Sequence, residues 1–144
     1  SSDLEVKMQP YTMWEDREIL AGLIAKTIRH YGFYSDCFVF GADYGLLSMI
    51  KKLDPAVNIG LIVPFVPVDP VRLMKEMGAV VYLNYVEQLT PDLVEELHEA
   101  GYLVDGSVIN TKERLNIAQK LGVDLAESDN PELILELLEE ENAG

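Results

Sequence analysis

The chain has 144 residues and 49% of them are hydrophobic, so it is long enough and apolar enough to form a globular core. Eleven Lys and Arg residues stand against 25 Asp and Glu, and the net charge of -14 disfavours binding to nucleic acid or to an anionic membrane surface. The single Cys37 excludes an internal disulfide, and no secretion or membrane-insertion signal occurs near the first residues, so we expect a cytoplasmic protein.

Short apolar runs rich in Val, Ile, Leu and Tyr recur along the chain and are predicted to be β-strands. They lie at Leu4–Met8, Cys37–Phe40, Ile59–Val63, Val80–Leu83, Tyr102–Asp105 and Val123–Ala126. An amphipathic helical stretch follows each run. A strand, loop and helix therefore repeat about six times, with a period of roughly 20 to 30 residues.

Helix starts and ends are marked by their usual residues. Three starts carry a capping side chain followed by proline, at Asp69-Pro70, Thr90-Pro91 and Asn130-Pro131. Three glycines lie where a helix is expected to stop, at Gly78, Gly101 and Gly122.

Repeated βα units with short connections predict parallel strands in a single α/β domain over residues 1–144. Either a doubly wound open sheet or part of a (βα)8 barrel fits this pattern. Neither the G-x-G-x-x-G dinucleotide motif nor the G-x-x-x-x-G-K-[ST] phosphate motif occurs. The glycine-rich segment Gly41–Gly45 is interpreted as a βα turn in which Asp43 caps the next helix.

Glu5 and Lys7 are the strongest functional candidates. They lie two residues apart in the first predicted strand, so they would project from the same face of a sheet. If both charges were buried there, the cost would be several kcal/mol unless a metal, a substrate or a partner charge compensated it. The pair alone does not make an active site.

From Leu4 onward, the order and spacing of several short motifs resemble those of the glycerophosphodiester phosphodiesterase family. The matching positions are Glu5 and Lys7 of an E-x-K strand, Asp43, Leu46-Leu47, Lys52–Pro55, Ile59–Leu61, Asn84, Leu89–Pro91, Glu99–Gly101, Asn110 of a W-T-V-N pattern, and Gly122–Asp124 with Ser128–Pro131 of a G-V-D-x-x-x-T-D-R-P pattern. No single motif is specific to the family, but the order and spacing of all the motifs together are.

The resemblance implies a partial (βα)8 TIM barrel of about six βα units that is completed by association. Family members are phosphoric diester hydrolases of lipid metabolism, and they hydrolyse glycerophosphodiesters to glycerol phosphate and an alcohol with a divalent metal, Mg²⁺ or Ca²⁺. Carried over residue by residue, Glu5 would be a metal ligand and Lys7 a catalytic residue facing the phosphate.

The resemblance also implies that much of the family's machinery has no counterpart in this chain. The match begins at the third βα unit, so the H-R-G motif, the E-x-D carboxylates and the second catalytic histidine are unmatched. His30 lies near a helix end and His98 on a helix surface, and both are interpreted as structural. We therefore expect the chain alone to bind metal weakly and to hydrolyse diesters negligibly.

The chain also departs from the family inside the matched region. Gly41-Ala42 replaces S-F, Ser107-Val108 replaces W-T, and Asp105 and Glu127 occupy positions that are usually apolar. Strand alternation places Asp105 and Ser107 on one face, with Glu127 nearby on the next strand. Either these strand ends are solvated, or the changes serve a different ligand or an assembly.

Three functional interpretations follow. The chain is a phosphodiesterase or the larger piece of one, or it is a natural or engineered half-barrel module that associates with another copy or with a complementing N-terminal fragment. A small-molecule binding module at the carboxyl ends of the strands is compatible with either. Native mass and metal-dependent diester hydrolysis would discriminate among them.

Overall fold

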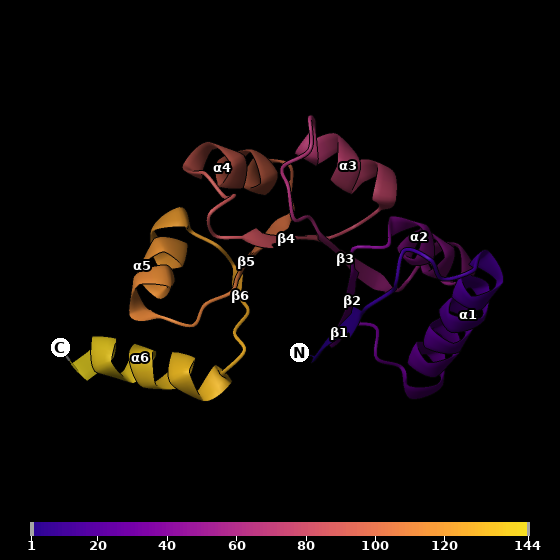
Figure 1. The fold of residues 1–144 in the computed structure, drawn as a ribbon, viewed down its shortest axis with the longest axis horizontal. Helices are drawn as coiled ribbons and strands as arrows, with labels where there is room; N and C mark the ends of the chain where they lie inside the picture. Colours follow the sequence, from indigo (N-terminus) through magenta and orange to yellow (C-terminus); the bar gives the residue numbers. More distant parts are fainter. Residues whose placement is uncertain (1, 144) are drawn as a thin grey trace. The chain divides into compact units, whose positions relative to one another are not determined.

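The computed structural model describes residues 2–143, and strands and helices alternate along them (Figure 1). The elements are β1 (Ser2–Val6), α1 (Trp14–Tyr31), β2 (Cys37–Gly41), α2 (Tyr44–Leu53), β3 (Asn58–Ile62), α3 (Pro70–Met77), β4 (Val81–Tyr85), α4 (Pro91–Glu99), β5 (Leu103–Ser107), α5 (Lys112–Leu121), β6 (Leu125–Ala126) and α6 (Pro131–Ala143). Among the described residues, no helix is both long and apolar enough to cross a membrane.

The described residues form two compact units. Unit 1 contains the residues up to Ile62 together with Arg72–Val80, and unit 2 contains Val63–Val71 and the residues from Val81 onward. In unit 1, β2 pairs in parallel with β1 and with β3. In unit 2, β5 pairs in parallel with β4 and with β6. Strand order follows chain order, which confirms the predicted parallel βα arrangement and excludes a reversal at a switch point.

All six strands differ from their predicted bounds by one or two residues at one or both ends, and β1 and β6 show a local cause. β1 spans Ser2–Val6 rather than Leu4–Met8, because the chain turns soon afterwards, where Thr12 N donates to Gln9 O at 3.0 Å. β6 is only Leu125–Ala126, since Val123 N donates to Ala118 O at the end of α5. In both cases, apolar residues beside the strand belong to a turn or to a helix end instead of the strand.

Three of the four predicted helix caps are confirmed. The side chains of Asp43, Thr90 and Asn130 accept hydrogen bonds from Leu46 N, Leu93 N and Leu133 N at 3.1, 3.2 and 3.3 Å. Each satisfies an amide that has no partner inside its helix. α3 begins at Pro70, and Gly122 ends α5 with a φ of 74°, a left-handed conformation that glycine adopts without strain.

In the core of unit 1, the Phe40 side chain of β2 lies close against the backbone of β3 at Gly60. Phe40 lies opposite Gly60 in the parallel register, and its side chain is 2% exposed. A methyl group added at Gly60 would come closer than 3.0 Å to three ring carbons of Phe40. The buried ring has little room to move, because side chains in protein cores are closely packed.

Gly60→Ala is therefore expected to lower the free energy of unfolding by about 1–3 kcal/mol, the usual cost of overpacking a core. The control is Gly22→Ala in α1, where the added methyl meets nothing within 4 Å. It should stabilise the helix by about 0.5–1 kcal/mol. Urea unfolding of the two variants measures the contrast, and equal stabilities would contradict the close approach of β2 and β3.

A network of polar side chains lies in unit 1 at the amino end of β3. The Tyr34 hydroxyl donates to Asp54 Oδ2 at 2.6 Å, and Ala56 N donates to Asp54 Oδ1 at 3.2 Å. Asn58 Nδ2 donates to the carbonyl oxygen of Tyr34 at 2.9 Å. The hydrogen bond from Tyr34 is the main cause that holds the pKa of the Asp54 carboxyl below its usual value.

A depressed folded-state pKa stabilises the protein above the unfolded pKa, and this stabilisation is lost as the pH falls through the folded value. Tyr34→Phe should therefore raise the Asp54 pKa toward its unfolded value, so that the stability this carboxyl contributes is smaller and its loss is complete at a higher pH. Carbon-detected NMR titration of the Asp54 carboxyl measures the shift. Tyr31→Phe is the control because Tyr31 is 63% exposed and stacks on Phe33, so an equal effect there would refute the assignment.

Candidate functional site

An open pocket of about 630 Å³ lies in unit 1 at the carboxyl ends of β1, β2 and β3. Its lining includes Glu5, Lys7, Arg17, Asp43, Tyr44 and Ile62. Because the strands are parallel, their carboxyl ends meet at one edge of the sheet, and the loops that follow them form the pocket walls. This is the edge at which barrel folds place their active sites.

Glu5 and Lys7 both line this pocket, and both side chains are exposed, so the desolvation cost of a buried pair does not arise. Lys7 Nζ lies 4.0 Å from Glu5 Oε2, and the side chains are 81% and 51% exposed. Lys7 follows the last residue of β1, so solvent reaches it. An exposed ion pair at this distance is weak, and both charges are accessible to a ligand.

The pocket lining also contains an ion pair that the sequence analysis did not predict. Arg17 Nε donates to Asp43 Oδ2 at 2.6 Å, and the side chains are only 12% and 18% exposed. Burial alone would raise the pKa of Asp43, but the Arg17 guanidinium and the Leu46 amide hold that pKa below its usual value. The carboxylate of Asp43 and the charge of Arg17 therefore neutralise each other.

These residues provide only part of a site for Mg²⁺ or Ca²⁺, which take about six to eight ligands, almost all of them oxygen. Among the described residues that line the pocket, the carboxylates belong to Glu5 and Asp43. Asp43 is already bound by Arg17 and by the α2 amides. Glu5 can contribute to a divalent metal site but cannot form one, so further ligands have to come from elsewhere.

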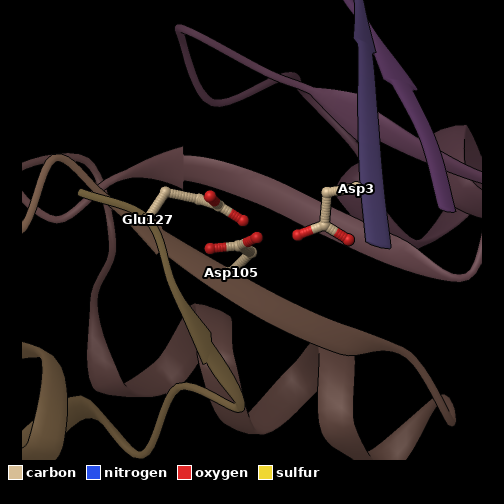
Figure 2. Close-up of side chains that lie close together, drawn as sticks. All are labelled: Asp3, Asp105 and Glu127. Carbon is tan, nitrogen blue, oxygen red and sulfur yellow. The ribbon is translucent and has the colours of Figure 1, made fainter. Parts of the chain in front are cut away.

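A second polar group lies in unit 2. Asp105 on β5 is fully buried, Ser107 is 7% exposed, and Glu127 directly follows β6. Carboxylate oxygens of Asp105 and Glu127 lie within 4.8 Å of each other. Figure 2 shows the two side chains pointing toward one another. The predicted proximity of the two carboxylates is confirmed, and Asp105 is not solvated as a wet strand end would be.

Asn110, the counterpart of the family's W-T-V-N asparagine, joins the loops that follow β5 and β6. Its Nδ2 donates to Asp129 Oδ2 at 3.0 Å, while its Oδ1 accepts from Ser128 Oγ at 2.8 Å and from Asp129 N at 3.1 Å. The amide thus uses both its donor and its acceptor within the loops. These bonds fix the two loops relative to each other.

The two histidines lie outside the pocket of unit 1. His98, in the last turn of α4, lies with its Nε2 at 2.7 Å from Asp124 Oδ2, which also accepts from Val104 N at 2.8 Å. His30 is in the last turn of α1, and its ring contacts the edge of Tyr31. His98 thus joins α4 to the segment before β6, and Asp124 joins that segment to β5.

Solved structures of phosphodiesterases share the fold of this chain. No family model matches the sequence. A candidate glycerophosphoryl diester phosphodiesterase from Silicibacter pomeroyi superimposes with a TM-score of 0.86 at 20% identity, over 96% of this chain and 50% of that protein. An Oleispira antarctica phosphodiesterase in complex with the product sn-glycerol-3-phosphate gives a TM-score of 0.82 at 19% identity, over 95% of this chain and 54% of that protein.

These superpositions show that the chain is a half-barrel of parallel βα units. In sequence, the chain is 26% identical over 115 residues to the glycerophosphodiester phosphodiesterase of Caldanaerobacter subterraneus. These aligned residues cover 80% of this chain and 47% of that protein. The chain thus spans about half the length of the proteins it matches. The resemblance to the glycerophosphodiester phosphodiesterase family, predicted from its motifs, is confirmed in both sequence and fold.

Proposed function

We propose that this half-barrel forms part of a metal-dependent glycerophosphodiester hydrolase, in which Glu5 binds the metal and Lys7 contacts the phosphate. The observation that carries the proposal is the pocket of unit 1, where an accessible carboxylate and an accessible ammonium lie at the carboxyl ends of parallel strands. Both residues occupy the E-x-K positions of the family resemblance. Turnover by this site requires additional ligands and an acid/base group.

The chemistry of the two side chains suits a phosphodiester. The substrate is an anion, and the Lys7 ammonium would stabilise the charge that develops on the phosphoryl oxygens. A divalent metal, when bound, would polarise a phosphoryl oxygen or activate water. Glu5 would hold one position of that metal, and the negative charge of Asp43 would not compete because Arg17 neutralises it.

A second candidate function is assembly, which the outer surface of β1 favours. Among the described strands, β1 and β6 have one neighbour each. Leu4 on β1 is 44% exposed beside an apolar groove of about 380 Å³, which Leu23 and Phe33 also line. An open strand edge next to an apolar groove is a surface that another copy or a complementing fragment would cover.

The enzymatic proposal predicts that the 144-residue chain alone has negligible metal-dependent activity on a glycerophosphodiester, and that adding the first two βα units of a family barrel in trans yields measurable activity. General acid/base catalysis alone typically contributes about 10² to 10⁴-fold, and the described pocket offers no histidine for it. The assay follows release of glycerol phosphate with Mg²⁺ or Ca²⁺.

Glu5→Gln is the decisive variant in that assay because it removes the carboxylate while keeping the side-chain size. Any complemented activity should fall to the level of the uncomplemented chain, because the carboxylate proposed to hold the metal is lost. Glu18→Gln on the exposed surface of α1 is the control and should keep its activity. Robust Glu5-dependent turnover by the chain alone would show that a complete site exists in it.

The assembly proposal predicts self-association in sedimentation experiments at concentrations on the order of 10 μM, above the dissociation constant of a strong dimer. Leu4→Lys should shift the chain toward monomer because a lysine on an edge strand opposes pairing. Val68→Lys, at a fully exposed loop position, is the matched control. A chain that is monomeric at this concentration would exclude strong homo-oligomerisation and leave only the complementing fragment as a partner.

A further inference from the structure

We propose that Arg17 is a positioning residue that anchors the loop between β1 and α1, and with it Lys7, against the start of α2. This inference rests on the proposed function, because Lys7 lines the pocket that is proposed to bind the phosphate. It concerns residues outside the E-x-K positions. Its basis is a set of contacts that converge on one guanidinium.

Arg17 contacts three separate segments of unit 1. Its Nε donates to Asp43 Oδ2 at 2.6 Å, and its Nη1 donates to the carbonyl oxygen of Thr12. Its guanidinium also lies over the ring of Trp14, 5.7 Å from the centroid. The loop, the first turn of α1 and the cap of α2 therefore share one cation, which is 12% exposed and only weakly screened by salt.

The contact with Thr12 fixes the end of the segment that carries Lys7. Thr12 N donates to Gln9 O at 3.0 Å, so residues 9–12 form a closed turn. Lys7 lies two residues before this turn, between it and the end of β1. The segment is thus held by the sheet on one side and by Arg17 on the other, and its pocket-lining residues have little freedom.

A close approach beside the ion pair supports the same anchoring. The Trp14 ring packs against Gly45 in the first turn of α2, where a methyl group would lie 2.9 Å from Trp14 Cη2. Glycine permits this approach because it has no side chain. The start of α1 and the start of α2 are therefore joined by an aromatic contact as well as by the Arg17 and Asp43 pair.

Arginine suits this position better than lysine. Its planar guanidinium can donate to the Asp43 carboxylate and to the Thr12 carbonyl at the same time, and it can stack on an aromatic ring. Its charge is neutralised by Asp43, so the accessible cation of the pocket is Lys7. Arg17 sets the position of that ammonium without binding the anion itself, which reduces the ordering cost when an anion binds.

The protein contains its own probe for this arrangement, because Trp14 is its single tryptophan. Trp14 emission and acrylamide quenching report on the contact with Arg17, and amide hydrogen exchange reports on residues 8–12. Titration with sn-glycerol 3-phosphate, followed by NMR of the same residues, reports on anion binding. The variants are Arg17→Gln, Arg17→Lys and Asp43→Asn, the last of which keeps an N-cap acceptor while removing the charge.

Arg17→Gln should increase quenching of Trp14, accelerate exchange at residues 8–12 and weaken sn-glycerol 3-phosphate binding by about tenfold, the typical effect of losing a hydrogen bond to a charged group. Arg17→Lys should recover part of each effect because it restores the charge. Arg29→Gln is the matched control, since Arg29 lies on the same helix, is 71% exposed and reaches Asp54 only at 3.8 Å. It should leave all three readouts unchanged.

The outcomes separate this inference from the proposed function. If the wild-type chain fails to bind sn-glycerol 3-phosphate, the proposed function loses its support. Hydrogen exchange tests the anchoring separately. Accelerated exchange at residues 8–12 in Arg17→Gln supports it, and unchanged exchange overturns it. If the wild-type chain binds and Arg17→Gln binds equally well, the positioning role is overturned. Faster exchange spread over all of α1 and α2 would also overturn it, because it would indicate a general structural role.

Discussion

The parallel register of β1, β2 and β3 is the constraint on which the pocket depends. Val6 pairs with Gly41, and Gly41 pairs with Leu61, so the three strands end at the same edge of the sheet. The segments that follow them must leave from that edge, since helices have to return the chain to the opposite one. Side chains from distant parts of the sequence are thereby brought into one pocket before any of them makes a specific contact.

The sequence predicted the elements well because their signals are local. Apolar periodicity located the strands, and Asp43 was identified as a cap from its place before α2. The partner of Asp43 could not be predicted in this way, because Arg17 lies 26 residues earlier and on another helix. The exposure of Lys7 could not be decided from the sequence either, since it depends on where β1 ends rather than on the residue types around it.

The charged side chains of unit 1 and of unit 2 differ in how accessible they are to a ligand. In unit 1, Arg17 and Asp43 neutralise each other, so Glu5 and Lys7 remain the accessible charges of the pocket. In unit 2, Asp105 is buried near Glu127, so its carboxylate is not accessible to an anionic ligand as Lys7 is. The pocket of unit 1 therefore provides the better starting point for binding an anionic substrate.

NMR mapping of sn-glycerol 3-phosphate on the isotope-labelled chain tests the central claim most directly. The account predicts chemical-shift changes centred on Glu5, Lys7 and the start of α2, which disappear in Lys7→Gln and persist in Lys120→Gln, a change on α5 in the other unit. Shifts centred elsewhere, or binding that survives Lys7→Gln unchanged, would contradict it.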